Sequence, residues 1–178
     1  KLPAVGISGH EVSGVVEAVG ENVFNLKVGD RVAGVINKSC GVCKYCVMGR
    51  DNLCSNIQRF RPEYFGFGEY VAAYPERMMK FGGDISFEEA AFTEPLAACV
   101  NGIMKMDVKP GEYVGVVGVG QIGLMHVQLA KLRGAEVVAF DMLDERLEIA
   151  GKLGADHVVN VGKGDAVKQA LEISGGDG

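Results

Sequence analysis

Four cysteines lie close together in this chain, and their spacing constrains the fold more than any other feature of the sequence. Cys40, Cys43 and Cys46 stand at every third position, and Cys54 completes the group. Thiols spaced in this way pair poorly as disulfides, but all four can turn toward one tetrahedral metal ion. Four thiolates select zinc or an iron–sulfur centre over harder metals. We therefore predict a closed, structural metal site; the alternatives are a disulfide pair or reduced, buried thiols.

A glycine motif in the second half of the chain has the pattern of a dinucleotide-binding turn. The motif consists of Gly118, Gly120 and Gly123. It lies between an apolar run at residues 113–118 and the start of an apolar segment at residues 122–133. The run is typical of a strand buried on both faces, and the segment is typical of a helix. The first glycine permits the tight bend, the second lets a pyrophosphate approach the backbone, and the third lets the helix pack on the sheet. The alternative is that these glycines serve only a turn.

The residues around this motif favour NAD over NADP. Gln121 and Ile122 stand at the expected helix start, where free backbone N–H groups can bind phosphate oxygens. Asp141 ends the next expected strand, where a carboxylate can accept hydrogen bonds from ribose hydroxyls and would repel the additional phosphate of NADP. Arg146 leaves NADP open, although we expect it on the exposed face of a helix, paired locally. For Asp141 the alternative is a solvated loop residue.

The remaining pattern predicts an α/β protein with an all-β part. Strand signals at residues 12–18, 31–36 and 65–73, separated by turns, predict a β region that resembles a barrel. Ser86 and Glu89 then form a capping box, which is the signature of a helix start.

After this β region, the signals predict the first half of a doubly wound dinucleotide fold. A helix start at residues 93–95, with proline in the first turn, leads into a helix that reaches about Met106. Strands and helices then alternate, with Asp144 and Asp165 as expected helix caps. The expected strands are residues 113–118, 136–140 and 157–161, and the expected helices are residues 122–133, 144–153 and 165–173.

Charge and hydropathy narrow the class of partner. The formal net charge of −5 argues against nucleic acid. A small zinc ribbon that binds a phosphate backbone is the alternative, because basic residues surround the cysteines. They are Lys38, Lys44, Arg50, Arg59 and Arg61. The longest apolar stretch, residues 113–130, is interrupted by polar residues and glycines, so we expect no membrane span. Thiols held on a metal suit a reducing compartment, and we expect a cytoplasmic protein.

Three features in order resemble the zinc-containing medium-chain dehydrogenase family: a Gly-His-Glu motif at residues 9–11, the cysteine cluster and the glycine motif. Glu-Pro-Leu at residues 94–96 resembles the polyol and threonine dehydrogenase branch. The resemblance extends over the whole chain. It implies a partial GroES-like β-barrel domain over residues 1–92, with a zinc lobe at residues 38–58. A connecting helix and the first half of a Rossmann NAD-binding domain would follow over residues 93–178.

The resemblance also implies a second, catalytic zinc. His10 would ligate it, Glu11 would ligate it or stand beside it, and Glu94 would bind directly or through a water. The four cysteines would hold the structural zinc. The alternatives are a structural histidine and a helix-start carboxylate favoured by the helix dipole. The family takes a further cysteine from before His10, so we expect a fragment that is inactive alone. Cys99 is expected in the core, and His126 and His157 are expected to be structural.

The implied function is hydride transfer between an alcohol and NAD, with NADP less favoured. The alcohol would be a polyol, a secondary alcohol or a threonine-like compound. We expect the intact protein to act as a homodimer or homotetramer on a small-molecule alcohol, without nucleic acid or membrane. Two alternatives stay open: a zinc-independent, NADPH-dependent relative resembling the quinone reductases, and a non-catalytic module that binds zinc and a nucleotide.

Overall fold

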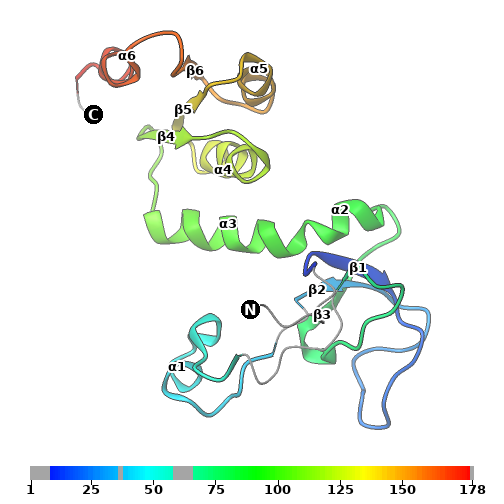
Figure 1. Ribbon diagram of the computed structural model, residues 1–178. Helices are drawn as coiled ribbons and strands as arrows, with labels where there is room; N and C mark the ends of the chain where they lie inside the picture. Colours follow the sequence, from blue (N-terminus) through cyan, green and yellow to red (C-terminus); the bar gives the residue numbers. More distant parts are fainter. Residues whose placement is uncertain (1–8, 36–37, 58–65, 177–178) are drawn as a thin grey trace, which may run out of the picture. The chain divides into compact units, whose positions relative to one another are not determined.

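The chain forms two compact units, Lys1–Glu94 and Pro95–Gly178, in a computed structural model that describes residues 9–35, 38–57 and 66–176. The first unit carries an antiparallel sheet and the cysteine lobe, and the second carries a parallel sheet with helices (Figure 1). The division expected after residue 92 falls close to the boundary between the units. The assignment of whole domains stays a prediction.

The first unit is built on a three-stranded antiparallel sheet. Its strands are β1 (Val12–Val15), β2 (Arg31–Gly34) and β3 (Met78–Lys80), in the order β1-β2-β3. Val32 and Met78 are buried, and four partly buried side chains pack against them: Val12, Val16, Leu26 and Val71. The alternating pattern that predicted β1 therefore places Val12 and Val16 in the small core, whereas Val15 is exposed.

The strand predicted at residues 65–73 is wrong in its described part, because residues 66–73 contain no strand; residue 65 lies outside the described residues. β3 takes its place, with Val32 opposite Lys80, so that β1 and β3 occupy both edges of β2. Val71 still contributes its side chain to the core. In the described residues the sheet is therefore open and does not close into the predicted barrel. β2 ends at Gly34, and residue 36 of its predicted range lies outside the described residues.

Short helical elements connect the sheet with the rest of the chain. The cysteine lobe contains α1 (Lys44–Val47) and the 3₁₀ helix η1 (Asp51–Leu53), and a second 3₁₀ helix, η3 (Pro75–Arg77), precedes β3. α2 (Phe87–Ala91) and α3 (Thr93–Met106) follow. The predicted capping box is confirmed at α2, because Glu89 N donates to Ser86 Oγ at 3.1 Å and Ser86 N donates to Glu89 Oε2 at 2.8 Å.

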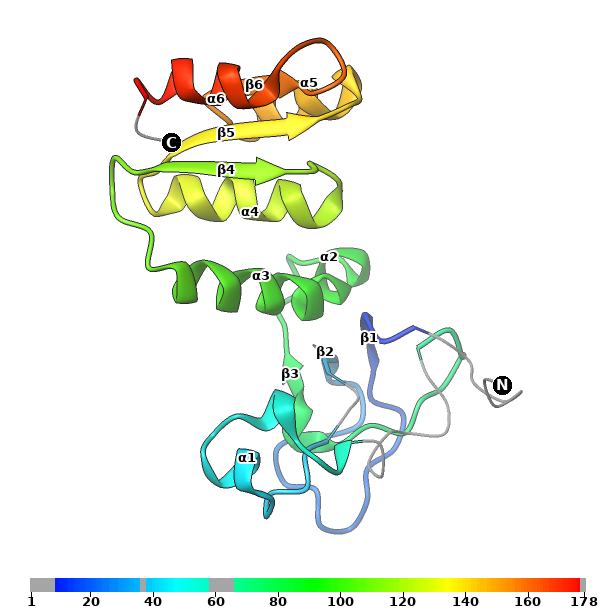
Figure 2. The same cartoon turned by 60° about the vertical axis from the view of Figure 1, so that its left-hand side comes forward.

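The second unit contains a parallel sheet in the order β4-β5-β6, as the sequence predicted. Figure 2 shows β4 and β5 side by side, with α4 along β4. The strands are β4 (Tyr113–Val117), β5 (Glu136–Asp141) and β6 (His157–Asn160). The helices are α4 (Gln121–Leu132), α5 (Asp144–Lys152) and α6 (Ala166–Ile173).

Helices cover both faces of this sheet. On one face, Val137 of β5 is fully buried in a core with Val127 of α4 and Leu147 of α5. On the other face, Val138 and Val159 pack against apolar residues of α6. β5 therefore buries both of its faces. This two-sided cover is the doubly wound arrangement that was predicted. The burial of both faces predicted for residues 113–118 is wrong, because Val116 of β4 is buried but Tyr113 and Val117 are exposed on this three-stranded sheet.

The two predicted caps of this unit have different outcomes. Asp165 caps α6, since Lys168 N donates to its Oδ1 at 3.0 Å. Asp144 does not cap α5, because Leu143 occupies the cap position and the Asp144 carboxylate accepts a hydrogen bond from Asn160 Nδ2 at 2.6 Å. In the part of the chain that the structure describes, none of the helices has the length and apolarity needed to span a bilayer.

Candidate metal and dinucleotide sites

The four cysteine sulfurs converge on one point of the first unit. Sγ of Cys43 lies 3.5 Å from Sγ of Cys46 and 4.0 Å from Sγ of Cys54, and Sγ of Cys40 lies 3.9 Å from Sγ of Cys46. Zn–S bonds of about 2.3 Å in a tetrahedron place sulfurs about 3.8 Å apart, so these separations fit one zinc ion. All five cysteines are free, which excludes the disulfide alternative. The cysteine set therefore fits a closed four-sulfur metal site.

Short-range hydrogen bonds favour the thiolate form of Cys40, whereas burial raises the pKa of Cys46 to about 11. Cys40 N donates to Sγ of Cys54 at 3.3 Å, and Cys43 N donates to Sγ of Cys40 at 3.4 Å. The Asn56 side chain donates to Sγ of Cys40 at 3.5 Å. The Asn56 amide, with backbone N–H groups, lowers the pKa of Cys40 to about 6. Donors aimed at a thiolate favour its ionised, metal-binding form.

Charged side chains connect the cysteine lobe to η3, the segment that precedes β3. Arg77, which ends η3 just before β3, donates from Nη2 to Ser39 Oγ and to Asp51 Oδ2, both at 2.9 Å. Lys38 pairs with Glu76 at 2.6 Å and lowers the pKa of that carboxyl. Of the basic residues that left a nucleic-acid partner open, Lys38 is thus engaged within the protein, and Arg59 and Arg61 lie outside the described residues.

A second cluster joins His10 and Glu11 to Glu94, which is far away in the sequence. One ligand atom from each of the three residues lies within 4.8 Å of the others. His10 Nε2 is 3.9 Å from Glu94 Oε2, which is too long for a hydrogen bond but close to the separation, about 3.4 Å, of two ligands on one zinc ion. The side chains of His10 and Glu94 are 58% and 25% exposed. Unlike the cysteine set, this cluster offers three nitrogen and oxygen donors and a side open to solvent.

The backbone conformation at position 9, beside this cluster, favours glycine. Gly9 has φ +96°, and a Cβ atom there would lie 2.9 Å from the Phe67 ring. Gly66 N also donates to Gly9 O at 3.0 Å. A side chain at position 9 would therefore disturb the placement of His10.

In the second unit, the glycine motif has the geometry that its pattern predicted. Gly118 has φ +84°, which permits the sharp turn after β4. A Cβ atom on Gly123 would lie 2.0 Å from the carbonyl oxygen of Gly118, whereas one on Gly120 would meet nothing within 4 Å. Gln121 and Ile122 are exposed at the start of α4. The turn is therefore tightly packed where Gly123 meets Gly118, and it is open at Gly120.

Asp141 is not the solvated loop residue of the alternative interpretation. It is 8% exposed at the end of β5, where Leu143 N donates to Oδ1 and Val119 N donates to Oδ2, both at 3.0 Å. The Leu143 N–H, together with that of Val119, holds the pKa of Asp141 below its usual range. Arg146 is half exposed, as expected, and its Nη1 lies 3.7 Å from Asp141 Oδ2. The acid thus joins the glycine turn to the next strand as an ionised group.

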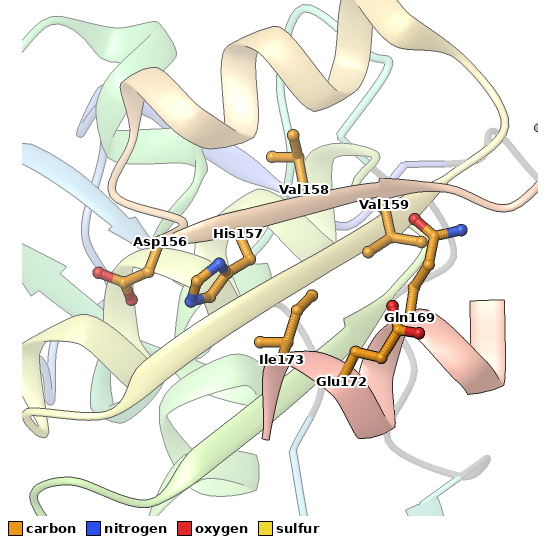
Figure 3. A pocket seen from close by; sticks show the side chains of 7 residues that line it. All are labelled: Asp156, His157, Val158, Val159, Gln169, Glu172 and Ile173. Atoms are coloured by element: carbon orange, nitrogen blue, oxygen red, sulfur yellow. The ribbon is translucent and has the colours of Figure 1, made fainter. Parts of the chain in front are cut away.

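The remaining candidates are placed in structural surroundings. Cys99 is 2% exposed in the core, as predicted. His157 pairs with Glu136 at 3.1 Å, and His126 packs against Gly102. A shallow groove of about 510 Å³ lies between β6 and α6 (Figure 3), and none of the predicted site residues lines it. Its lining consists of Asp156, His157, Val158, Val159, Gln169, Glu172 and Ile173.

The sequence patterns did not reveal the residues that support the cysteine cluster. Asn56 and Arg77 act on the cysteine lobe from outside the ligand motif, and neither belongs to a recognisable pattern. Only the proximity of Asn56 to Cys54 in the sequence could have drawn attention to it.

Two protein families match successive parts of the chain. Residues 1–82 match the alcohol dehydrogenase GroES-like domain, and residues 122–178 match the zinc-binding dehydrogenase family. An alcohol dehydrogenase of Geobacillus stearothermophilus is 42% identical over 180 residues, covering 99% of this chain and 52% of that protein. The chain belongs to the zinc-containing medium-chain dehydrogenase family. The resemblance seen in the sequence is therefore confirmed.

Other members of the family match over the same extent. A sorbitol dehydrogenase of Bacillus subtilis strain 168 is 36% identical over 171 residues, covering 94% of this chain and 48% of that protein. The solved structure of an NAD-dependent alcohol dehydrogenase gives a TM-score of 0.89 at 34% identity, covering 99% of this chain and 53% of that one. The chain spans about half the length of these relatives. These matches confirm the predicted fold class, a GroES-like part followed by a Rossmann-type part.

Proposed function

We propose that this chain belongs to a zinc-dependent dehydrogenase that transfers hydride between an alcohol and NAD. The observation that carries the proposal is the convergence of His10, Glu11 and Glu94 at a point separate from the four cysteines. A closed four-sulfur site braces a fold, whereas three donors with an open side are typical of a catalytic zinc. Two metal sites of different character are what such an enzyme needs.

His10, Glu11 and Glu94 would hold the catalytic zinc in this proposal. When bound, zinc supplies a Lewis acid that polarises the alcohol oxygen and eases the loss of its proton. The exposed side of His10 leaves room for the substrate oxygen to approach. The cysteines would hold the structural zinc and keep the lobe folded.

The dinucleotide would be bound by residues of the second unit. The open backbone at Gly120 and the exposed start of α4, with Gln121 and Ile122, would receive the pyrophosphate. Asp141 is ionised and held in place by two backbone N–H groups, so it would accept hydrogen bonds from the adenosine ribose. Its charge favours NAD over NADP, and Arg146 would lie beside the same ribose.

The substrate would be a secondary alcohol, a sugar alcohol or a threonine-like compound. The relatives named as alcohol dehydrogenase and sorbitol dehydrogenase support this range. Glu94 belongs to the Glu-Pro-Leu motif that resembles the polyol and threonine dehydrogenase branch, which supports a sugar alcohol or a threonine-like substrate.

The decisive experiment measures zinc per chain in the full-length protein and in two variants. We expect two zinc ions in the wild type. Cys43→Ser should lose the ion of the cysteine lobe, and His10→Ala should lose the other ion and abolish NAD reduction with a panel of polyols and secondary alcohols. One zinc ion in the wild type and no NAD reduction would contradict the proposal and favour a non-catalytic zinc-binding module.

A further inference from the structure

The segment that leads to Glu94 is attached to the strand that follows His10 and Glu11. Ser13 lies in β1, and its Oγ donates to the backbone carbonyl of Phe87 at 2.6 Å. Phe87 is the first residue of α2. The hydroxyl of one strand residue thus fixes the start of this helix to β1.

Arg31 fixes the same helix start to β2. Its Nη1 donates to Gly82 O at 2.9 Å and its Nη2 donates to Ile85 O at 2.7 Å. Its guanidinium also lies 4.5 Å from the ring centre of Phe81 and 4.6 Å from that of Phe87. Two carbonyls and two aromatic rings therefore hold one side chain, and a lysine ammonium cannot reproduce this planar arrangement.

Both attachments meet at Phe87, and α2 leads from there directly into α3, where Glu94 is the second residue. α2 has only five residues, so its placement depends on contacts with its surroundings rather than on its own stability. Its own cap and the buried Ala90 define where it begins and which face it buries. Its position relative to His10 and Glu11, in contrast, is set by Ser13 and Arg31.

We propose that Ser13 and Arg31 are positioning residues for the metal site of His10, Glu11 and Glu94. The inference rests on the proposed function, because it concerns the metal of that same site. Loss of a direct hydrogen-bond partner of a metal ligand typically weakens metal binding by about 10- to 100-fold, and Ser13 and Arg31 act one contact further away, so the low end of this range applies. The cysteine lobe is held by other residues, Arg77 and Asn56, and should not respond.

The test uses the full-length protein with Co²⁺ in place of zinc. Ser13→Ala removes the hydroxyl, and Arg31→Lys keeps the charge but removes the planar fork. Ser13→Thr keeps a hydroxyl and is the rescue variant. Ser174→Ala is the matched control, since Ser174 Oγ donates to a backbone carbonyl, that of Leu171, in the second unit. Chelator competition measures the affinity of the nitrogen and oxygen site, and thiolate absorption reports the cysteine site separately.

We expect Ser13→Ala and Arg31→Lys to weaken Co²⁺ binding at the His10 site by roughly tenfold, with an unchanged thiolate spectrum. Ser13→Thr and Ser174→Ala should bind as the wild type does. Unchanged affinity in both variants, or an equal loss at both metal sites, would overturn the inference and leave the proposed function intact. A wild type that binds only one metal ion overturns both. If one variant does not fold, the other decides by the same criteria.

Discussion

At the scale of single residues, the glycine turn of the second unit is held from two sides. First, the helix start at Gly123 packs directly on the carbonyl of Gly118. Second, the Asp141 carboxylate accepts a hydrogen bond from the backbone N–H of Val119, which lies within the turn. A carboxylate proposed to bind the ribose thus also fixes the turn proposed to bind the pyrophosphate. Both halves of the proposed dinucleotide site are therefore coupled through one side chain.

Gly123→Ala should destabilise the second unit, because its methyl group would lie 2.0 Å from the Gly118 carbonyl oxygen. Overpacking of this kind typically costs about 1–3 kcal/mol. Gly151→Ala in α5 is the matched control, since a Cβ atom there meets nothing within 4 Å. The free energy of unfolding of that variant should rise by about 0.5–1 kcal/mol. Urea unfolding measures both, and equal changes would contradict this view of the turn.

At the scale of elements, the cysteine lobe is a small segment with a candidate metal site and few other stabilising contacts. No residue of α1 or η1 is fully buried, so the lobe cannot rely on an apolar core. Its supports in the described residues are the converging sulfurs and the pairs formed by Arg77 and Lys38. Metal binding should therefore supply most of its folding free energy.

Arg77→Lys should increase local opening of the cysteine lobe without removing its zinc. Nη2 of Arg77 makes both hydrogen bonds, and the shorter lysine side chain cannot bring its ammonium to the same position between Ser39 and Asp51. We expect faster hydrogen exchange in residues 38–57, with zinc content unchanged. Arg133→Lys, in the second unit, is the control. If exchange in the lobe stays at the wild-type rate, Arg77 does not fasten it.

At the scale of the whole molecule, each compact unit has its own core and its own candidate ligand. The first unit contains both groups of candidate metal ligands, and the second contains the glycine turn and Asp141. A ligand that binds only the folded form of one unit stabilises that unit by mass action. Zinc and the dinucleotide should therefore protect different parts of the chain.

NAD at 100 times its dissociation constant should stabilise the second unit by about 2.7 kcal/mol. Hydrogen exchange of strands β4 and β5 in the full-length protein measures this protection. NADP at the same concentration should protect less, because Asp141 is ionised. Equal protection by the two dinucleotides would argue that Arg146, rather than Asp141, decides the choice of cofactor.

Short-range patterns in the sequence were sufficient for several features, because their physical causes act over a few residues. The spacing of Cys40, Cys43 and Cys46 predicted convergence on one metal. The glycine motif predicted its turn, and the capping box of Ser86 predicted the start of α2. The strands and helices of the second unit followed from their apolar periods. The pairing of His10 with Glu94, however, came from the family resemblance and from no local pattern.

The sequence by itself therefore determined the two ligand motifs, the dinucleotide turn and the α/β order of the second unit. The tertiary structure alone decided that β3, and not residues 66–73, pairs with β2. It also decided that Asp144 binds Asn160 instead of capping a helix, and that Ser13 and Arg31 hold α2. These contacts join residues far apart in the sequence. Their free energy depends on which surfaces meet in the folded chain, and no local pattern records that.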